Sequence, residues 1–400
     1  MRPNFWISLT FLGLSLLAPA LSARPEYAAR YHVNRCTVCH VSSVGGGVRN
    51  KNGKLYGLRN LGVNAFSTQD LISADIRALY YQPEKPSSTP GGLGIMAANV
   101  SANVPVHNLT LKTPGLRVVL SENVGGFPGG AGGPRDAYAR IKYYSDNETH
   151  WYPQYVLLGR FHAPFGVMND EHRTYTKIQT KTTWHDFEMG AMFSGDPLES
   201  LHYDLALVNG KKTGGVSLGS GVATQWGSVL NFRWTPAKLP LVLGFSSSYL
   251  DGLQGGHSPF SGSLYSIVTL DKITHYHVRG SVILEYVEAK FWNSSISNFI
   301  SDSSYQTAVQ DSQSTGWWAQ FNYELNPRWT LNYKYDQLIL DKKFPGDGYI
   351  RNGFGFTYVA DANVLLKARL EKALATASAE ANGSERGALD AGWLEIQLYL

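Results

Sequence analysis

The sequence is poor in cysteine, in charge and in long hydrophobic runs. Only two of its 400 residues are cysteine, and 16% are charged. No later segment is a long unbroken apolar run, which excludes membrane-spanning helices in the mature chain. A single cysteine pair excludes a four-cysteine zinc site. The formal net charge of +4 is small for this length, and we expect no nucleic-acid partner.

Common hydrolase and nucleotide-binding motifs are missing as well. The chain contains no H-E-x-x-H and no phosphate-binding glycine loop. Their absence disfavours a general acid–base enzyme, and no catalytic residue is assigned on this basis.

The first 23 residues have the features of a signal peptide. Arg2 precedes a short apolar run from Phe5 to Leu17, and small residues surround Ala23. This run is too short for a spanning helix and is closely followed by Pro19. We therefore expect export, with cleavage near Ala23.

The two cysteines form a haem-attachment motif. Cys36-Thr37-Val38-Cys39-His40 fits the Cys-x-x-Cys-His pattern, in which each thiol adds to one vinyl group of a haem. His40 would then bind the iron as the proximal ligand. The sequence thus predicts one covalent haem c held by Cys36, Cys39 and His40, with His40 as the metal ligand.

Two other interpretations of the pair stay open. A structural disulfide suits an exported protein, which meets oxidising conditions. A thioredoxin-like redox pair would need a surrounding βαβ unit, which the flanking sequence does not offer.

We assign residues 24–62 to a monohaem cytochrome c segment. Three consecutive glycines, at 45–47, cannot lie inside a stable helix, but they allow a backbone path close to a flat cofactor. The segment has few apolar residues to surround a porphyrin, so we expect the rest of the protein to supply part of the haem's surroundings.

From about residue 71 to the C-terminus, apolar and polar residues alternate with a period of two. Trp329, Leu331 and Tyr333, for example, alternate with Thr330 and Asn332. This pattern is typical of two all-β folds. In a soluble sandwich the apolar face forms a core, whereas in an outer-membrane barrel it faces lipid and the polar face lines a lumen.

Three features favour a transmembrane antiparallel β-barrel over residues 71–400. The runs are about ten residues long, which is enough to cross a bilayer at a tilt. Tyr and Trp gather near their ends, as in aromatic girdles. Charged residues recur on the inward face, where a wet lumen accepts them and an apolar core does not. These residues are Asp75, Arg77, Arg328, Lys334 and Asp336.

Counting the runs predicts about sixteen strands, an even number as expected for a bacterial barrel. The short links at 326–327 and 360–363 are predicted periplasmic turns, and the links at 82–92, 122–135, 251–261 and 292–313 extracellular loops. The predicted strands are 71–81, 93–104, 109–121, 136–145, 151–161, 184–195, 199–209, 222–235, 239–250, 262–272, 275–289, 314–326, 328–340, 350–361, 363–374 and 388–400.

One long stretch without strand character, Phe161 to Lys181, interrupts the series. A loop of this length in a compact barrel is usually functional or folds inward. Its charges around Asp170 would narrow the lumen or collect cations. A solvated surface loop is the alternative.

Several of these motifs resemble one family. Tyr27-Ala28-Ala29-Arg30, the haem motif and Gly45-Gly46-Gly47-Val48-Arg49 are similar to the haem segment of outer-membrane monohaem cytochrome c–porin fusions, a cytochrome-porin family that includes iron oxidases. Gly159-Arg160-Phe161, Pro164-Phe165-Gly166 and His172 resemble a motif of porin-like barrels. The resemblance implies electron transfer at the outer membrane, but does not by itself imply iron oxidation.

On this basis the haem would transfer electrons between the outside of the cell and the periplasm. The extracellular partner would be an electron donor or acceptor, with ferrous iron as one candidate, and the periplasmic partner would be a carrier such as a soluble cytochrome. Outer-membrane lipid would surround the barrel. Two alternatives remain: a passive porin with a structural haem, and a barrel that surrounds a separate multihaem cytochrome. The sixth iron ligand is not assigned. The candidates are Met96, His32, His107 and His162, and the period-two pattern places Met96 on the lipid face.

The haem motif gives the first testable prediction. A pyridine haemochrome assay on the purified membrane fraction should show one covalent c-type haem per chain, because two thioether bonds survive denaturation. A Cys36→Ala, Cys39→Ala variant should lose it. A colourless wild-type protein would refute the haem assignment.

Overall fold

The structure of this protein is a computed structural model that describes most of the chain after residue 70. The predicted signal peptide and the predicted haem segment, residues 1–23 and 24–62, lie outside the described residues. The described ranges are 71–83, 92–108, 110, 113–126, 133–144, 149–168, 174–180, 182, 187–209, 226–236, 239–251, 258–274, 278–290, 313–326, 328–343, 348–361, 364–375 and 391–399.

Sixteen strands and two short helices make up this part of the chain. The helices are α4, Tyr175–Thr180, and α5, Leu270–Ile273. The strands are β1 Ile72–Pro83, β2 Gly92–His107, β3 Gly115–Gly126, β4 Gly133–Lys142, β5 Tyr155–His162, β6 Phe187–Leu198, β7 Leu201–Asn209, β8 Trp226–Trp234, β9 Leu241–Leu250, β10 Phe260–Thr269, β11 Gly280–Lys290, β12 Gln313–Glu324, β13 Trp329–Ile339, β14 Gly348–Asp361, β15 Val364–Ala375 and β16 Ala391–Tyr399.

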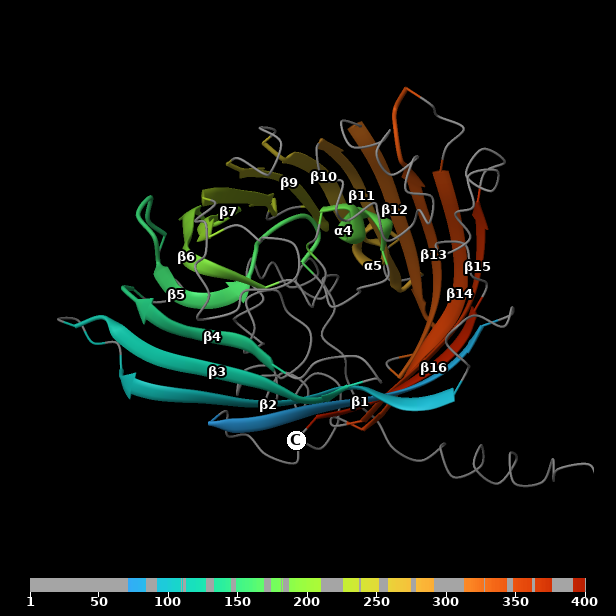
Figure 1. Cartoon of the computed structure of the whole chain (residues 1–400), viewed down its shortest axis with the longest axis horizontal. Helices are drawn as coiled ribbons and strands as arrows, with labels where there is room; N and C mark the ends of the chain where they lie inside the picture. The colour runs from blue at the N-terminus through green and yellow to red at the C-terminus, as the bar shows by residue number, and fades with distance from the viewer. Residues whose placement is uncertain are drawn as a thin grey trace, which may run out of the picture.

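The strands form one closed antiparallel barrel, as Figure 1 shows. Each strand pairs with the next in sequence, and β1 closes the ring against β16, with Ile76 opposite Leu398. The predicted fold class and strand number are confirmed. The largest differences are at β3, which is Gly115–Gly126 and not 109–121, and at β11, which begins at Gly280 and not 275. Residues 270–273 form α5 where the tenth strand was expected to continue.

The two faces of the wall differ in polarity as the alternation predicted. On the outward face, Leu264 is 59% and Phe245 43% exposed. On the inward face of β13, Asn332, Lys334 and Asp336 are all buried. The inward charges predicted at Asp75 and Arg77 are likewise buried. Arg328 is the exception, since it lies in the link before β13.

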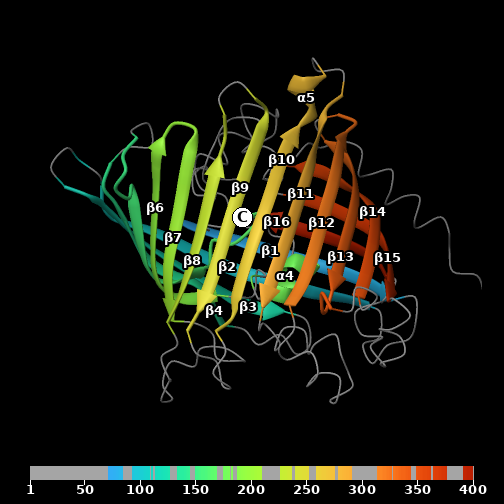
Figure 2. The same cartoon turned by 90° about the horizontal axis from the view of Figure 1, so that it is seen from above.

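The shortest links between strands lie at one end of the barrel, and the longest lie at the other. The short links 199–200, 325–328 and 362–363 lie at one end, as do the start of β1 and the end of β16. The links 163–186, 210–225, 291–312 and 376–390 lie at the other. Figure 2 shows the tilted strands running between these ends. This asymmetry is that of outer-membrane barrels, whose short turns face the periplasm.

Aromatic side chains lie at the short-link end, on the outside. Trp151 is 75% and Tyr152 55% exposed, and the Tyr203 hydroxyl donates to the carbonyl of Trp151 at 3.2 Å. Rings with one apolar and one polar edge suit the boundary between hydrocarbon and headgroups.

The outward apolar face gives a stability prediction. Leu264→Arg should lower the free energy of unfolding in lipid vesicles by about 2–4 kcal/mol, because it places a cation in hydrocarbon. Gln320→Arg, on the inward half-buried face of β12, should cost less than about 1 kcal/mol. Denaturant titration in vesicles measures both, and equal costs would contradict the assigned faces.

Candidate functional site

The segment that follows β5 folds into the barrel. We call its described residues, 163–168 and 174–180, the lumenal segment. Nearly all are buried, and α4 within it contacts the inward faces of β11, β12 and β13. Figure 1 shows α4 inside the ring of strands. The expectation that this stretch folds inward is therefore confirmed for these residues.

Glu285, on β11, anchors the first half of the lumenal segment. Its Oε1 accepts the backbone N–H of Val167 at 2.9 Å and the Ser263 hydroxyl at 3.1 Å, and its Oε2 accepts the Thr176 hydroxyl at 3.0 Å. Gly166 adopts a φ of 65°, and a Cβ there would collide with the Glu285 carboxylate. Glycine thus lets the backbone approach the carboxylate.

Asp336, on β13, anchors the second half. Both of its oxygens lie 3.0 Å from the backbone nitrogen of Tyr175, the first residue of α4. The barrel wall thus supplies the acceptor that a free helix end lacks. Arg351 lies 3.9 Å from Asp336, and its guanidinium stacks on the Tyr175 ring at 4.3 Å.

A glycine in the wall beneath α4 leaves room for the helix. Gly316 on β12 faces the helix, and a Cβ at this position would lie 2.6 Å from Gln179 Nε2 and 3.3 Å from Thr176 Cγ2. A larger residue would push α4 away from the wall and into the lumen.

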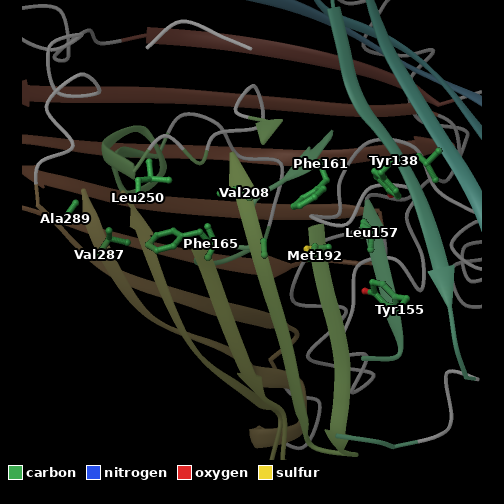
Figure 3. Packing of buried hydrophobic residues seen from close by; sticks show 13 residues of the cluster. Tyr138, Tyr155, Leu157, Phe161, Phe165, Met192, Val208, Leu250, Val287 and Ala289 are labelled. Atoms are coloured by element: carbon green, nitrogen blue, oxygen red, sulfur yellow. The ribbon is translucent and has the colours of Figure 1, made fainter. Parts of the chain in front are cut away.

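Apolar packing holds the segment as well. Phe165 packs in a buried cluster that includes Leu250, Val208 and Val287 of the wall, as Figure 3 shows. Val167 belongs to a second cluster, with Trp318 and Tyr265 among its members. The lumen is therefore not wet throughout, because the wall beneath the lumenal segment is largely apolar.

A polar network fills the wall near the short-link end of β6, β7 and β8. His202 Nδ1 lies 2.6 Å from Asp196 Oδ1, and His202 Nε2 lies 3.1 Å from Asp204 Oδ1. Ser194 donates to Asp204 at 2.5 Å, and Arg233 binds its other oxygen at 2.8 Å. His202 and Ser194 are fully buried, so they are not accessible as an acid–base or nucleophile pair. No group of His, Cys, Asp and Glu side chains in the described residues is arranged to hold a metal ion.

Beyond the lumenal segment the inward wall carries paired charges. Asp75 and Arg77 lie 3.1 Å apart, Lys367 and Glu395 3.1 Å, and Arg369 and Glu371 3.4 Å. These pairs lie on β1, β15 and β16. Each of these charges is therefore compensated by an opposite charge on the same wall, as buried ions require.

The predicted haem residues Cys36, Cys39 and His40, and the candidate His32, lie outside the described residues. The three other ligand candidates are not brought together. His162 is buried at the end of β5 that leads into the link 163–186. Its ring packs against Phe187, with ring centroids 4.1 Å apart. His107 is exposed at the short-link end of β2.

Met96 lies where the alternation of β2 is interrupted. Leu93 and Ile95 are exposed, whereas Ala97 and Asn99 are buried, because the pairing with β1 shifts by one residue at Met96. Such a bulge exchanges the two faces. The regular pattern that placed Met96 on the lipid face therefore does not hold at this residue, which is half-buried.

The sequence pattern found only part of this site. Asp336 was recognised as an inward charge, but its role as an acceptor for the lumenal segment depends on a residue 161 positions away. The sequence pattern did not identify Glu285 as a site residue. The alternation of β11 places Glu285 on the same inward face as Ile283 and Val287. A carboxylate between two apolar residues on one face of a strand could have identified it.

The anchor at Asp336 can be tested directly. Asp336→Ala leaves the buried Tyr175 N–H without its acceptor and should destabilise the anchored segment by about 1–3 kcal/mol. Amide exchange over residues 174–180 should quicken by about 5- to 150-fold in this variant, since each 1.4 kcal/mol is about tenfold. Asp336→Asn, which keeps an acceptor oxygen, should lie between it and wild type. Unchanged exchange in the alanine variant would show that Asp336 is not an anchor.

Comparisons with known proteins support the fold. The barrel is similar to an anion-selective porin from Comamonas acidovorans, with a TM-score of 0.56 and 10% sequence identity over 82% of this chain and 98% of the porin. It is also similar to Salmonella typhi OmpF in complex with daunomycin, with a TM-score of 0.58 and 11% identity over 82% and 97% of the two chains.

A third similar structure is the trimer form of in-vitro folded OmpT from Vibrio cholerae, with a TM-score of 0.54 and 9% identity over 82% of this chain and 98% of that one. No family model and no curated protein matches the sequence. At these identities the likeness shows the fold alone. The described part of the chain is a 16-strand outer-membrane porin-like β-barrel.

Proposed function

We propose that the protein is a passive channel for small hydrophilic solutes, narrowed by the lumenal segment. The observation that carries this proposal is the segment itself, held against the inward wall by Glu285 and Asp336 inside a closed barrel. A rigid constriction sets an upper size for a permeating solute, and polar walls exclude apolar ones.

The same geometry weakens one alternative. A barrel that surrounds a separate multihaem cytochrome would have to leave its lumen open. Here α4 and residues 163–168 pack against the inward faces of β8 to β14, through Asn231 on β8 and Tyr349 on β14 at the limits of that range. The anchored segment occupies the space that such a partner would need.

Electron transfer through a covalent haem c is a second candidate, favoured by Cys36, Cys39 and His40. Since β1 begins at the short-link end, residues 63–71 connect the haem segment to that end and span at most about 30 Å when extended. A haem held there would exchange electrons with a periplasmic carrier. Of the described ligand candidates, His107 lies at this end. In this second candidate function, ferrous iron is one of the extracellular electron donors that could reduce the haem.

Conductance separates the two candidates. Full-length protein in planar lipid bilayers should give stable stepwise conductance, and proteoliposomes should swell in small sugars. A Cys36→Ala, Cys39→Ala variant should conduct like wild type, because the channel requires only the barrel. If neither protein conducts, the channel proposal fails. Turnover reduction of the purified haem by ferrous ion would instead support electron transfer.

A further inference from the structure

We propose that a phosphate-bearing lipid of the outer leaflet binds on the outside of the barrel, between Lys290 on β11 and Lys342 in the link that follows β13. The proposal concerns the outward face of the barrel, so it goes beyond the channel function and does not depend on it. Both lysines are exposed. They lie at the long-link end, where β11 leads into the link 291–312 and β13 also ends. In outer-membrane barrels this end faces the outside of the cell.

The outward side chains of β11 follow the change of polarity across a membrane boundary. Along the strand toward the long-link end they are Leu284, Tyr286, Glu288 and Lys290. Residues on a strand rise by about 3.4 Å each, so this series extends over about 20 Å from an apolar side chain to a cation. Leu284 is 44% exposed, as expected for a lipid-facing position. The series therefore places Lys290 at the level of the lipid headgroups.

Two aromatic rings lie on the hydrocarbon side of these charges. Tyr286 is opposite Trp317 in the register of β11 and β12, and their ring centroids are 4.6 Å apart. Trp317 is 49% exposed on the outward face. Such rings are enriched where the hydrocarbon ends, because they combine an apolar body with a polar edge. They mark the depth at which a headgroup begins and offer an apolar surface to the acyl chains.

The two lysines flank one residue of β12. Lys290 is opposite Gln313, and the Lys342 N–H donates to the Gln313 carbonyl at 2.8 Å. Figure 2 shows β11, β12 and β13 side by side. Because neighbouring strands are about 4.8 Å apart, the two lysine backbones are separated by about 10 Å across β12. Ammonium groups on flexible stems can converge on one phosphate from this spacing, since lysine binds phosphate as a point charge.

Glu288 holds Lys342 on the outward face. The Lys342 Nζ donates to Glu288 Oε1 at 2.6 Å, and the Tyr286 hydroxyl donates to Glu288 Oε2 at 3.3 Å. The Lys342 and Glu288 side chains are 40% and 33% exposed. An ion pair as exposed as this contributes little to stability, so a phosphate can compete for the ammonium group.

The neighbouring charges leave this surface cationic. Lys343 follows Lys342 and is exposed, whereas Asp341 is buried and its Oδ1 accepts the backbone N–H of Lys343. Among the described residues of this surface, three lysines and one carboxylate, Glu288, reach solvent. Exposed cations at headgroup level attract anionic lipids. A second copy docked by the same surface would place lysines against lysines, so charge complementarity favours the lipid.

The experiment titrates full-length protein in neutral detergent with diphosphoryl lipid A and measures bound lipid by native mass spectrometry. Wild type should bind this lipid, and bind its dephosphorylated form at least about tenfold more weakly, because lysines recognise the phosphates. Lys290→Gln, Lys342→Gln should weaken binding by about 10- to 30-fold, since each lysine near a lipid surface contributes roughly fivefold. Lys290→Arg, Lys342→Arg keeps both charges and should bind within about threefold of wild type.

Glu288→Gln distinguishes a lipid site from a purely structural ion pair. It removes the carboxylate that competes for Lys342, so lipid binding should tighten by about two- to fivefold. A matched control, Arg279→Gln, Arg328→Gln, removes two cations at the short-link end and should leave the affinity unchanged.

Four results would overturn the inference. They are equal weakening in the lysine and arginine double variants, equal affinity for the two forms of the lipid, weaker binding in Glu288→Gln, and occupation of the site by inorganic phosphate alone. A change in the number of subunits, without a change in lipid affinity, in the lysine double variant would assign the surface to a second copy and would equally overturn it.

Discussion

The structure depends on backbone hydrogen bonding in a medium without water. Each unpaired N–H or C=O in hydrocarbon costs several kcal/mol, so a sheet that crosses a bilayer must close on itself. The pairing of β1 with β16 meets this requirement and makes the inside of the ring a separate compartment. The alternation of apolar and polar residues then becomes a lipid-facing surface and a lumen wall.

The same requirement explains how the lumenal segment is held. Its backbone N–H groups lie away from any strand, and buried donors need acceptors. Glu285 and Asp336 provide them from the wall, and a charged acceptor forms a stronger hydrogen bond than a neutral one. Apolar contacts at Phe165 and Val167 add packing on the same side of the lumen. The result is an asymmetric interior, in which the segment lies against one side of the barrel wall.

This asymmetry connects the two functional hypotheses. In the proposed channel, solutes would pass beside the lumenal segment. The chain enters the barrel at the start of β1, at the short-link end, so a haem segment at residues 24–62 would be tethered to that end of the channel. The channel and the haem are therefore neighbours in the proposed arrangement. Their independence is what the cysteine variant examines.

The number of strands, their order and the face on which most side chains lie could be predicted from the alternation of apolar and polar residues. A period of two in side-chain direction makes these features local, and Lys334 and Asp336 were placed correctly for that reason. The wall that the lumenal segment covers could not be predicted in this way, because its anchors are separated from it by more than a hundred residues. The bulge at Met96 and the opposition of Arg117 and Arg140 could not be predicted either, since register depends on the partner strand.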